Sequence, residues 1–231
     1  MAEGSTNFMK KLLTTGIIGT DWPKTAYLIV VIKNMSGKVI WKKNYRTLPR
    51  QDSSNQHHTE SQMLKDQEFK NFIEKLYSSD ETKEVDSILT SNYSPCKECA
   101  DDLIKFYEDK ESPVRKLTIR FAHPYQTKKD KQRHLDGLKD LHRVGITLEA
   151  MTEESWRDTM MIDKSWFDAM TDAKSSFEEM MNEEHWFDKV MKLFRLDPDS
   201  VRKRDVATGG KLATLLVKTP RLKDLSTDSK L

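Results

Sequence analysis

The apolar residues of this 231-residue chain form short dense runs that alternate with longer segments of helical spacing. Runs rich in β-branched and aromatic residues predict five strands, at Thr25–Lys33, Val39–Tyr45, Val85–Thr90, Arg115–Ala122 and Ile146–Met151. The polar segment Asn34–Lys38 contains Ser36-Gly37 and predicts a hairpin turn between the first two strands.

Helical spacing predicts the elements between and after these strands. The expected helices are Asn7–Leu13, Thr59–Leu76, Cys96–Tyr107, Lys131–Arg143, 152–162, 173–194 and 199–217, the last interrupted at Gly209-Gly210. Strands that alternate with helices in this way predict an α/β fold, with a mixed sheet flanked by helices. The length suits one domain, 1–231, with a core at about 25–151 and a helical extension at about 152–220.

The net charge of +2 hides a segmented distribution. Residues 127–143 carry six basic and three acidic residues, 153–188 carry three basic and eleven acidic, and 189–223 carry ten basic and three acidic. Only two cysteines are present, which favours a reducing compartment over a disulfide framework. The first residues do not read as a signal peptide and no run has the length of a membrane span, so we expect cytoplasm, nucleus or both.

Two short motifs carry candidate metal chemistry. His58-Thr59-Glu60 is followed, after a gap of 34 residues, by Pro95-Cys96-Lys97-Glu98-Cys99. One histidine and two cysteines supply three zinc ligands and leave the fourth tetrahedral position open for water. Glu60 lies two residues after His58 and can move protons at that position without binding the metal. Both motifs fall at predicted helix N-termini, where the partial positive charge favours thiolates.

Two other interpretations stay open. A structural zinc site would need a fourth ligand, for which the sequence offers His57, although adjacent residues rarely point at one metal. A redox pair would explain Cys96 and Cys99 but not the preceding Pro95 or the upstream glutamate. The position of Glu60 favours the open, catalytic site, since no structural site needs a carboxylate there.

The chain resembles the AID/APOBEC-like branch of the cytidine deaminase superfamily. The resemblance rests on the order of the elements from about Thr25 to Met151, on Asn92-Tyr93-Ser94-Pro95-Cys96, and on His142-Arg143-Val144-Gly145-Ile146-Thr147-Leu148. It implies a cytidine deaminase-like fold in three α/β/α layers, with a five-stranded mixed sheet and about six to seven helices. It also implies that His58, Cys96 and Cys99 hold one Zn²⁺ per chain, and that Glu60 moves protons while cytosine becomes uracil.

The resemblance further implies a substrate pocket, whose residues would be Thr59, Tyr93, Ser94, His123, Tyr125, Arg46 and Thr47. The loop 122–129, with the rings of His123 and Tyr125, resembles the family's recognition loop, on which a flipped base can stack. Tyr93 replaces the family's usual tryptophan, Thr47 stands where many relatives have asparagine, and the chain between the two motifs is longer than usual, apparently through an insertion near 78–84. These differences concern which cytosine is accepted.

Basic residues beyond the recognition loop have two interpretations. Lys128, Lys129, Lys131 and Arg133 could line a groove that follows phosphates, or they could form an ordinary solvated helix face. Arg202-Lys203-Arg204 is likewise either a solvated face or a nucleic-acid or nuclear-import patch. The acidic segment 153–188 would repel a nucleic-acid backbone, so we expect any strand on the opposite side, near the loops 48–57 and 122–129.

Seven of the eleven methionines lie between Met151 and Met191, among six aromatic residues, and their spacing is typical of helix packing, with a partner-binding groove as the alternative.

The sequence therefore predicts a zinc-dependent deaminase of cytosine in a single-stranded polynucleotide, DNA before RNA, with no membrane partner and no predicted oligomer. A deaminase of free cytidine or nucleotides remains an alternative. So does a catalytically quiet relative that binds nucleic acid or protein.

Overall fold

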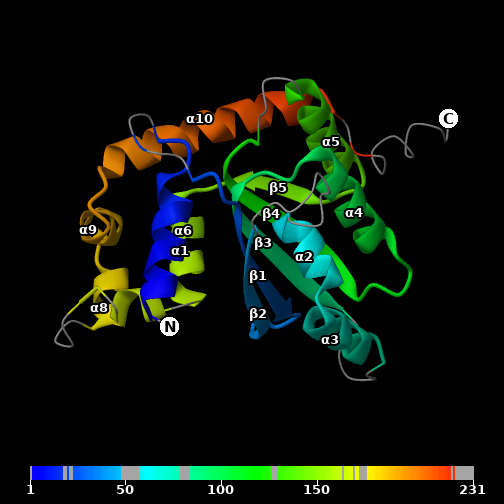
Figure 1. Ribbon diagram of the computed structural model, residues 1–231, viewed down its shortest axis with the longest axis horizontal. Helices are drawn as coiled ribbons and strands as arrows, with labels where there is room; N and C mark the ends of the chain where they lie inside the picture. Colours follow the sequence, from blue (N-terminus) through cyan, green and yellow to red (C-terminus); the bar gives the residue numbers. More distant parts are fainter. Residues whose placement is uncertain are drawn as a thin grey trace.

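The sheet is mixed and has five strands, as predicted. The computed structural model describes residues 2–17, 20, 23–47, 58–78, 84–125, 130–162, 164–168, 170–171, 176–219 and 221. The strands are β1 (Tyr27–Asn34), β2 (Val39–Arg46), β3 (Val85–Tyr93), β4 (Val114–His123) and β5 (Thr147–Ala150), in the order β2-β1-β3-β4-β5 (Figure 1). β1 pairs antiparallel with β2 and β3, whereas the β3–β4 and β4–β5 pairs are parallel.

Ten helices occur in the part of the chain that the structure describes, more than the six to seven expected. They are α1 (Ala2–Thr14), α2 (Thr59–Lys65), α3 (Gln67–Ser78), α4 (Lys97–Glu108), α5 (Lys131–Arg143), α6 (Glu153–Ile162), α7 (Ser165–Asp168), α8 (Phe177–Asn182), α9 (Trp186–Leu193) and α10 (Pro198–Val217). The excess comes from α7, from the division of 173–194 into α8 and α9, and from the division of Thr59–Leu76 into α2 and α3.

The division between α2 and α3 lies at Asp66, whose backbone is extended. Its carboxylate accepts hydrogen bonds from the Tyr45 hydroxyl at 2.6 Å and the Glu68 backbone N–H at 3.0 Å, and it pairs with Lys43 at 2.7 Å. These contacts to β2 and to the first turn of α3 compensate for the lost helical hydrogen bonds.

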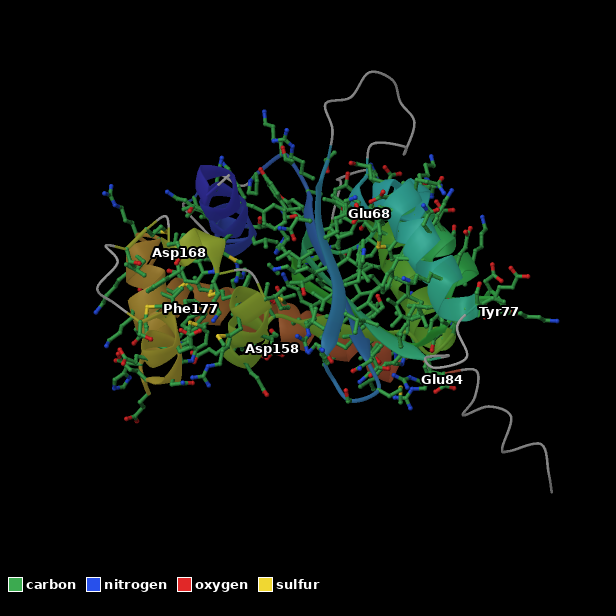
Figure 2. All side chains as sticks on the ribbon, turned by 90° about the horizontal axis from the view of Figure 1, so that it is seen from below. Glu68, Tyr77, Glu84, Asp158, Asp168 and Phe177 are labelled. Atoms are coloured by element: carbon green, nitrogen blue, oxygen red, sulfur yellow. The ribbon has the colours of Figure 1, made fainter. Side chains whose placement is uncertain are left out.

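Helices cover both faces of the sheet (Figure 1), which gives the predicted three layers. Alternate residues of β1 enter two separate cores: Leu28, Val30 and Ile32 face the layer of α2 to α5, whereas Ile29 and Val31 face the layer of α1 and α6 to α9. Figure 2 shows both layers from below, with Phe177 in one and with Glu68 and Tyr77 of α3 in the other.

The methionine-rich segment forms the core of the layer that contains α1 and α6 to α9. The buried methionines there pack with Trp156, Trp166, Phe177 and Phe187, which confirms the packing interpretation; they are Met151, Met160, Met180, Met181 and Met191. The acidic residues that the structure describes in this segment are exposed, apart from the partly exposed Asp188, and two of them, Asp158 and Asp168, are labelled in Figure 2.

Helix α10 crosses the end of the sheet from α9 to α5 (Figure 1) and joins the two cores, because Val201 enters one and Leu212 the other. The predicted interruption at Gly209-Gly210 is wrong, since the helix continues through both residues. Two glycines weaken a helix by about 1 kcal/mol each. Burial of Leu212 and a 3.1 Å hydrogen bond from the Thr208 hydroxyl to the Ala122 carbonyl offset this cost.

Arg204 of α10 is only 6% exposed, so both interpretations of the basic triplet are wrong for this residue, whereas Lys203 is exposed and Arg202 is partly exposed. Its guanidinium donates to the carbonyls of Leu13 at 2.6 Å and Thr15 at 2.8 Å, and it pairs with Asp205. The residue therefore fastens the C-terminal end of α1 to α10. No helix among the described residues is long and apolar enough to span a membrane.

Candidate active site

The three candidate metal ligands lie at the N-termini of two neighbouring helices. His58 is the N-cap residue of α2, and Cys96 is the N-cap residue of α4. The Cys96 sulfur accepts a hydrogen bond from the Cys99 backbone N–H at 3.4 Å, which holds both cysteines in the first turn. Free N–H groups at a helix N-terminus stabilise negative charge, so this position favours thiolates over thiols.

The donor atoms of these residues converge. The Nδ1 atom of His58 lies 3.3 Å from the Sγ of Cys96 and 3.4 Å from the Sγ of Cys99. All three atoms lie within 4.8 Å of one another. Tetrahedral bonds of about 2.0 Å to nitrogen and about 2.3 Å to sulfur would place such atoms about 3.5 Å apart. The three residues therefore lie close enough to bind one metal ion.

The protonation of the two thiols also fits a cation. A side-chain hydrogen bond with Cys99 lowers the pKa of the Cys96 thiol most, and the contact with His58 and the backbone N–H of Cys99 lower it further. The side-chain hydrogen bond between the two cysteines, together with burial, raises the pKa of the Cys99 thiol. Two thiolates in one buried place repel each other unless a positive charge lies between them. A metal ion would supply that charge.

Glu60 is 6% exposed and lies in the first turn of α2. The hydroxyl of Thr59, a fully buried residue, donates a 3.0 Å hydrogen bond to the Oε2 atom of Glu60. This contact orients the carboxylate. The negative charge of Glu60 contributes to raising the pKa values of Cys96 and Cys99, so the carboxylate acts electrostatically on both sulfurs.

Three of the expected pocket residues are linked at the C-terminal ends of β3 and β4. The Ser94 hydroxyl accepts a 2.9 Å hydrogen bond from the backbone N–H of Tyr125. The rings of Tyr93 and Tyr125 pack edge to face with their centroids 6.0 Å apart. The Tyr93 hydroxyl donates to the Pro23 carbonyl at 2.9 Å, so this ring is fixed at both ends.

His123, a fourth expected pocket residue, lies half-buried against the end of α1. Gly16 there has φ +81°, and a Cβ at this glycine would lie 2.9 Å from the Nδ1 atom of His123. Burial lowers the pKa of His123 to about 4, and the charges of Lys211 and Arg204 contribute to this shift. The imidazole is therefore neutral at pH 7.

Two further residues support the group formed by Tyr93, Ser94 and Tyr125, and sequence patterns did not identify them. The Nδ1 atom of His134 accepts a 3.2 Å hydrogen bond from the Lys97 backbone N–H, and its ring packs 5.0 Å from that of Tyr125. Asn92 accepts from the Tyr27 backbone N–H and donates to the Thr15 hydroxyl at 3.1 Å. Both act through partners distant in sequence, so helical or strand spacing gives no signal for them.

The other expected residues lie in different surroundings. The Thr47 hydroxyl accepts a 3.0 Å hydrogen bond from the Ala26 backbone N–H, and the Arg46 carbonyl accepts from Gln62. Arg133 forms an ion pair with Glu98, while Lys131 is exposed at the start of α5. Other expected positions lie outside the described residues: Lys128, Lys129, His57, the loop 48–57, residues 79–83 of the expected insertion, and residues 126–129 of the recognition loop.

Comparison with known proteins agrees with this arrangement. No curated protein gave a significant match to the chain. A family model described as invertebrate AID/APOBEC deaminase matches residues 8–178, which is about three quarters of the sequence and includes both metal half-sites and all five strands. This chain therefore belongs to the invertebrate AID/APOBEC deaminase family.

Proposed function

We propose that the chain is a zinc-dependent hydrolase that converts cytosine to uracil in a single-stranded polynucleotide, DNA in the first place and RNA in the second. The observation that carries the proposal is the convergence of one imidazole nitrogen and two sulfurs beside a buried carboxylate. Membership of a deaminase family supports the reaction type, and the family's action on nucleic acids supports the substrate class.

His58, Cys96 and Cys99 would hold the zinc ion. When bound, the metal would act as a Lewis acid that makes a water molecule a nucleophile near neutral pH. The softness of two thiolates favours zinc over magnesium or calcium, which prefer oxygen ligands. No fourth His, Cys, Asp or Glu joins this ligand group within the described part of the chain, which supports a site with one open position.

Glu60 would act as the proton carrier. Its carboxylate would take a proton from the attacking water and deliver it to N3 of cytosine as the bond from oxygen to C4 forms. The second proton of the water would pass through Glu60 to the exocyclic nitrogen, the C4–N bond would break, and ammonia would leave. The products are then uracil and ammonia, and Thr59 would keep the carboxylate oriented.

Ser94, Tyr93 and Tyr125 would form the wall against which the target base lies. An unstacked base needs an aromatic surface to compensate for the stacking it loses on leaving the strand. Tyr125 offers such a ring, and His123 contributes a second, neutral one. We assign smaller roles to Arg46 and Thr47, at the end of β2, and to Lys131 and Arg133, on the path that the strand would follow.

We also propose that residues 1–231 work as one domain, because α10 packs into both cores and Arg204 joins it to α1. The N-terminal end of the chain would then belong to the same folded unit as the metal ligands.

The test is a comparison of substrates with the purified, zinc-loaded chain. Uracil formation should be measured on a single-stranded DNA oligonucleotide, on RNA of the same sequence, on the DNA duplex and on free deoxycytidine. The proposal expects the highest rate on single-stranded DNA and the lowest on the free nucleoside. Equal or faster reaction of free deoxycytidine would contradict the polynucleotide assignment, and absence of uracil from all four would contradict the deaminase assignment.

A further inference from the structure

A groove between α5 and α10 lies outside the candidate active site. It has a volume of about 690 Å³, which is within the usual range for small-molecule pockets of roughly 300–1,000 Å³. Phe121 of β4 and Pro124, just beyond the end of that strand, also line the groove. None of these positions belongs to the candidate zinc site.

The rim of the groove is strongly basic. Five cationic side chains line it, and no acidic side chain from the described residues does; the five are Lys131, Lys139, Arg143, Lys211 and Lys218. Lys139 pairs with Asp136 and Arg143 pairs with Asp140, each at 2.7 Å along α5. Several positive charges around one concave surface favour a ligand with more than one negative charge.

The floor of the groove is apolar. It consists of Leu135 and Leu138 from α5 and of Leu212 and Leu215 from α10. Leu135 and Leu215 remain partly exposed, so part of the floor is accessible. An apolar floor below a cationic rim suits a flat ring that carries phosphate, as in a nucleotide, better than it suits inorganic phosphate.

The groove begins one residue away from the proposed base-binding wall. Pro124 lines the groove, whereas the next residue, Tyr125, packs against Tyr93 and is bonded to Ser94. Lys211 on the groove is also close enough to His123 to act on its titration. The groove and the proposed base-binding wall therefore meet just beyond the C-terminal end of β4.

We propose that this groove is a second binding site for the polynucleotide strand and binds an unstacked nucleotide other than the target cytidine. The base would lie on the leucines and the flanking phosphates would lie between the lysines of α5 and α10. This inference rests on the proposed function, because it assumes that the substrate is a strand. The basic charge and the continuity with the wall favour a strand over a free nucleotide.

The test compares two charge-matched variants of the full chain. Lys211→Gln with Lys218→Gln removes two cations from the groove, and Lys75→Gln with Lys38→Gln removes two exposed cations elsewhere. Binding of a labelled single strand should be measured over a series of salt concentrations. We expect the groove variant to bind about tenfold more weakly at low salt, with a slope of log affinity against log salt that is about 1.4 less steep. The control variant should match the unmodified chain.

Two variants at Gly210, another residue that lines the groove, test the site without removing a lysine. A side chain added at Gly210 would meet no other atom within 4 Å at its Cβ, so Gly210→Glu and Gly210→Gln should both fold. We expect both to weaken strand binding and Gly210→Glu to weaken it more, since it adds a negative charge beside the phosphates.

Three results would overturn the inference. They are equal losses in the groove and control variants, no loss at Gly210→Glu, and a groove-dependent affinity for a free deoxynucleoside monophosphate with unchanged affinity for the strand. Uracil formation is measured in the same samples, so the two proposals fail separately. A strand that binds through the groove without being deaminated would contradict the proposed reaction, and a deaminated strand that ignores the groove would contradict this site.

Discussion

Replacement of Arg204 by methionine should lower the free energy of unfolding more than the loss of a surface charge on the same helix. The guanidinium donates to the carbonyls of Leu13 and Thr15 and pairs with the Asp205 carboxylate, and it lies over the Trp156 ring at 5.4 Å from the centroid. Methionine has a similar length and fills similar space, so the perturbation is the loss of charge and hydrogen bonds and not the creation of a cavity.

The magnitude follows from what remains unpaired. In Arg204→Met, Asp205 keeps only the 2.8 Å hydrogen bond from the Trp156 indole, and burial already raises the pKa of this carboxyl. Loss of one partner of a buried ion pair costs about 3–5 kcal/mol, which includes the charge left behind. We expect a decrease of about 4 kcal/mol in the free energy of unfolding, which is a large part of the roughly 5–15 kcal/mol of a typical domain.

The assay is denaturant unfolding followed by circular dichroism, with Arg202→Met as the matched control. Arg202 lies two residues earlier on α10 and pairs with Glu153, Asp188 and Asp199 at the surface, so its loss should cost about 1–2 kcal/mol at most. Adding Asp205→Asn to Arg204→Met should restore about 2 kcal/mol, because it removes the unpaired charge. A loss at Arg204 no larger than at Arg202, or no recovery in the double variant, would refute this reasoning.

Three further predictions concern the site. Dialysis against a strong chelator should remove the zinc and abolish uracil formation, and added Zn²⁺ should restore both. The variant Cys99→Ser should bind less than one zinc per chain, as measured by atomic absorption. Thr59→Val removes the hydrogen bond to Glu60 at nearly constant size, so we expect kcat to decrease about tenfold with little change in KM, and an unchanged kcat would show that the hydroxyl does not orient the carboxylate. His123 has a pKa of about 4 in the folded chain and 6.5 as its ordinary value, so between these pH values the unfolded chain binds the extra proton and stability decreases as the pH falls. Solvent screening of this half-exposed ring limits the effect to about 1 kcal/mol, and His123→Asn should remove it from a pH series of unfolding curves.

Patterns local in sequence predicted most of the fold. The five strands were predicted within a few residues of their observed ends. β1, β3 and β4 are dense apolar runs that contribute to the cores on both faces of the sheet, whereas β2 lies at the edge of the sheet and is mostly exposed or partly exposed. The helix Lys131–Arg143 was predicted with its observed bounds, and the hairpin turn was predicted from Ser36-Gly37, where Gly37 has φ +80°. In these places propensity and packing agree.

The wrong predictions share a dependence on distant partners. Asp66 divides a segment of good helical spacing because Tyr45 and Lys43 on β2 hold its carboxylate. Gly209 and Gly210 fail to end α10 because contacts with β4 and the core support the helix around them. Arg204 belongs to a basic triplet in the sequence, but in the fold the end of α1 contacts its guanidinium. Single-sequence spacing contains no information on such contacts.

The candidate site divides in the same way. The approach of His58 to Cys96 and Cys99 follows from two helix N-termini on one side of a sheet, and the sequence predicts it. Support of the wall by His134 and Asn92 depends on packing between elements that are far apart in the chain, and the sequence does not predict it.

The central claim is that Glu60 moves protons at a metal centre held by His58, Cys96 and Cys99. Its most direct test is to measure uracil formation on single-stranded DNA and zinc content together in the unmodified chain and in Glu60→Ala. We expect one zinc per chain in both proteins, with uracil formed by the unmodified chain alone. Undiminished uracil formation by Glu60→Ala would contradict it.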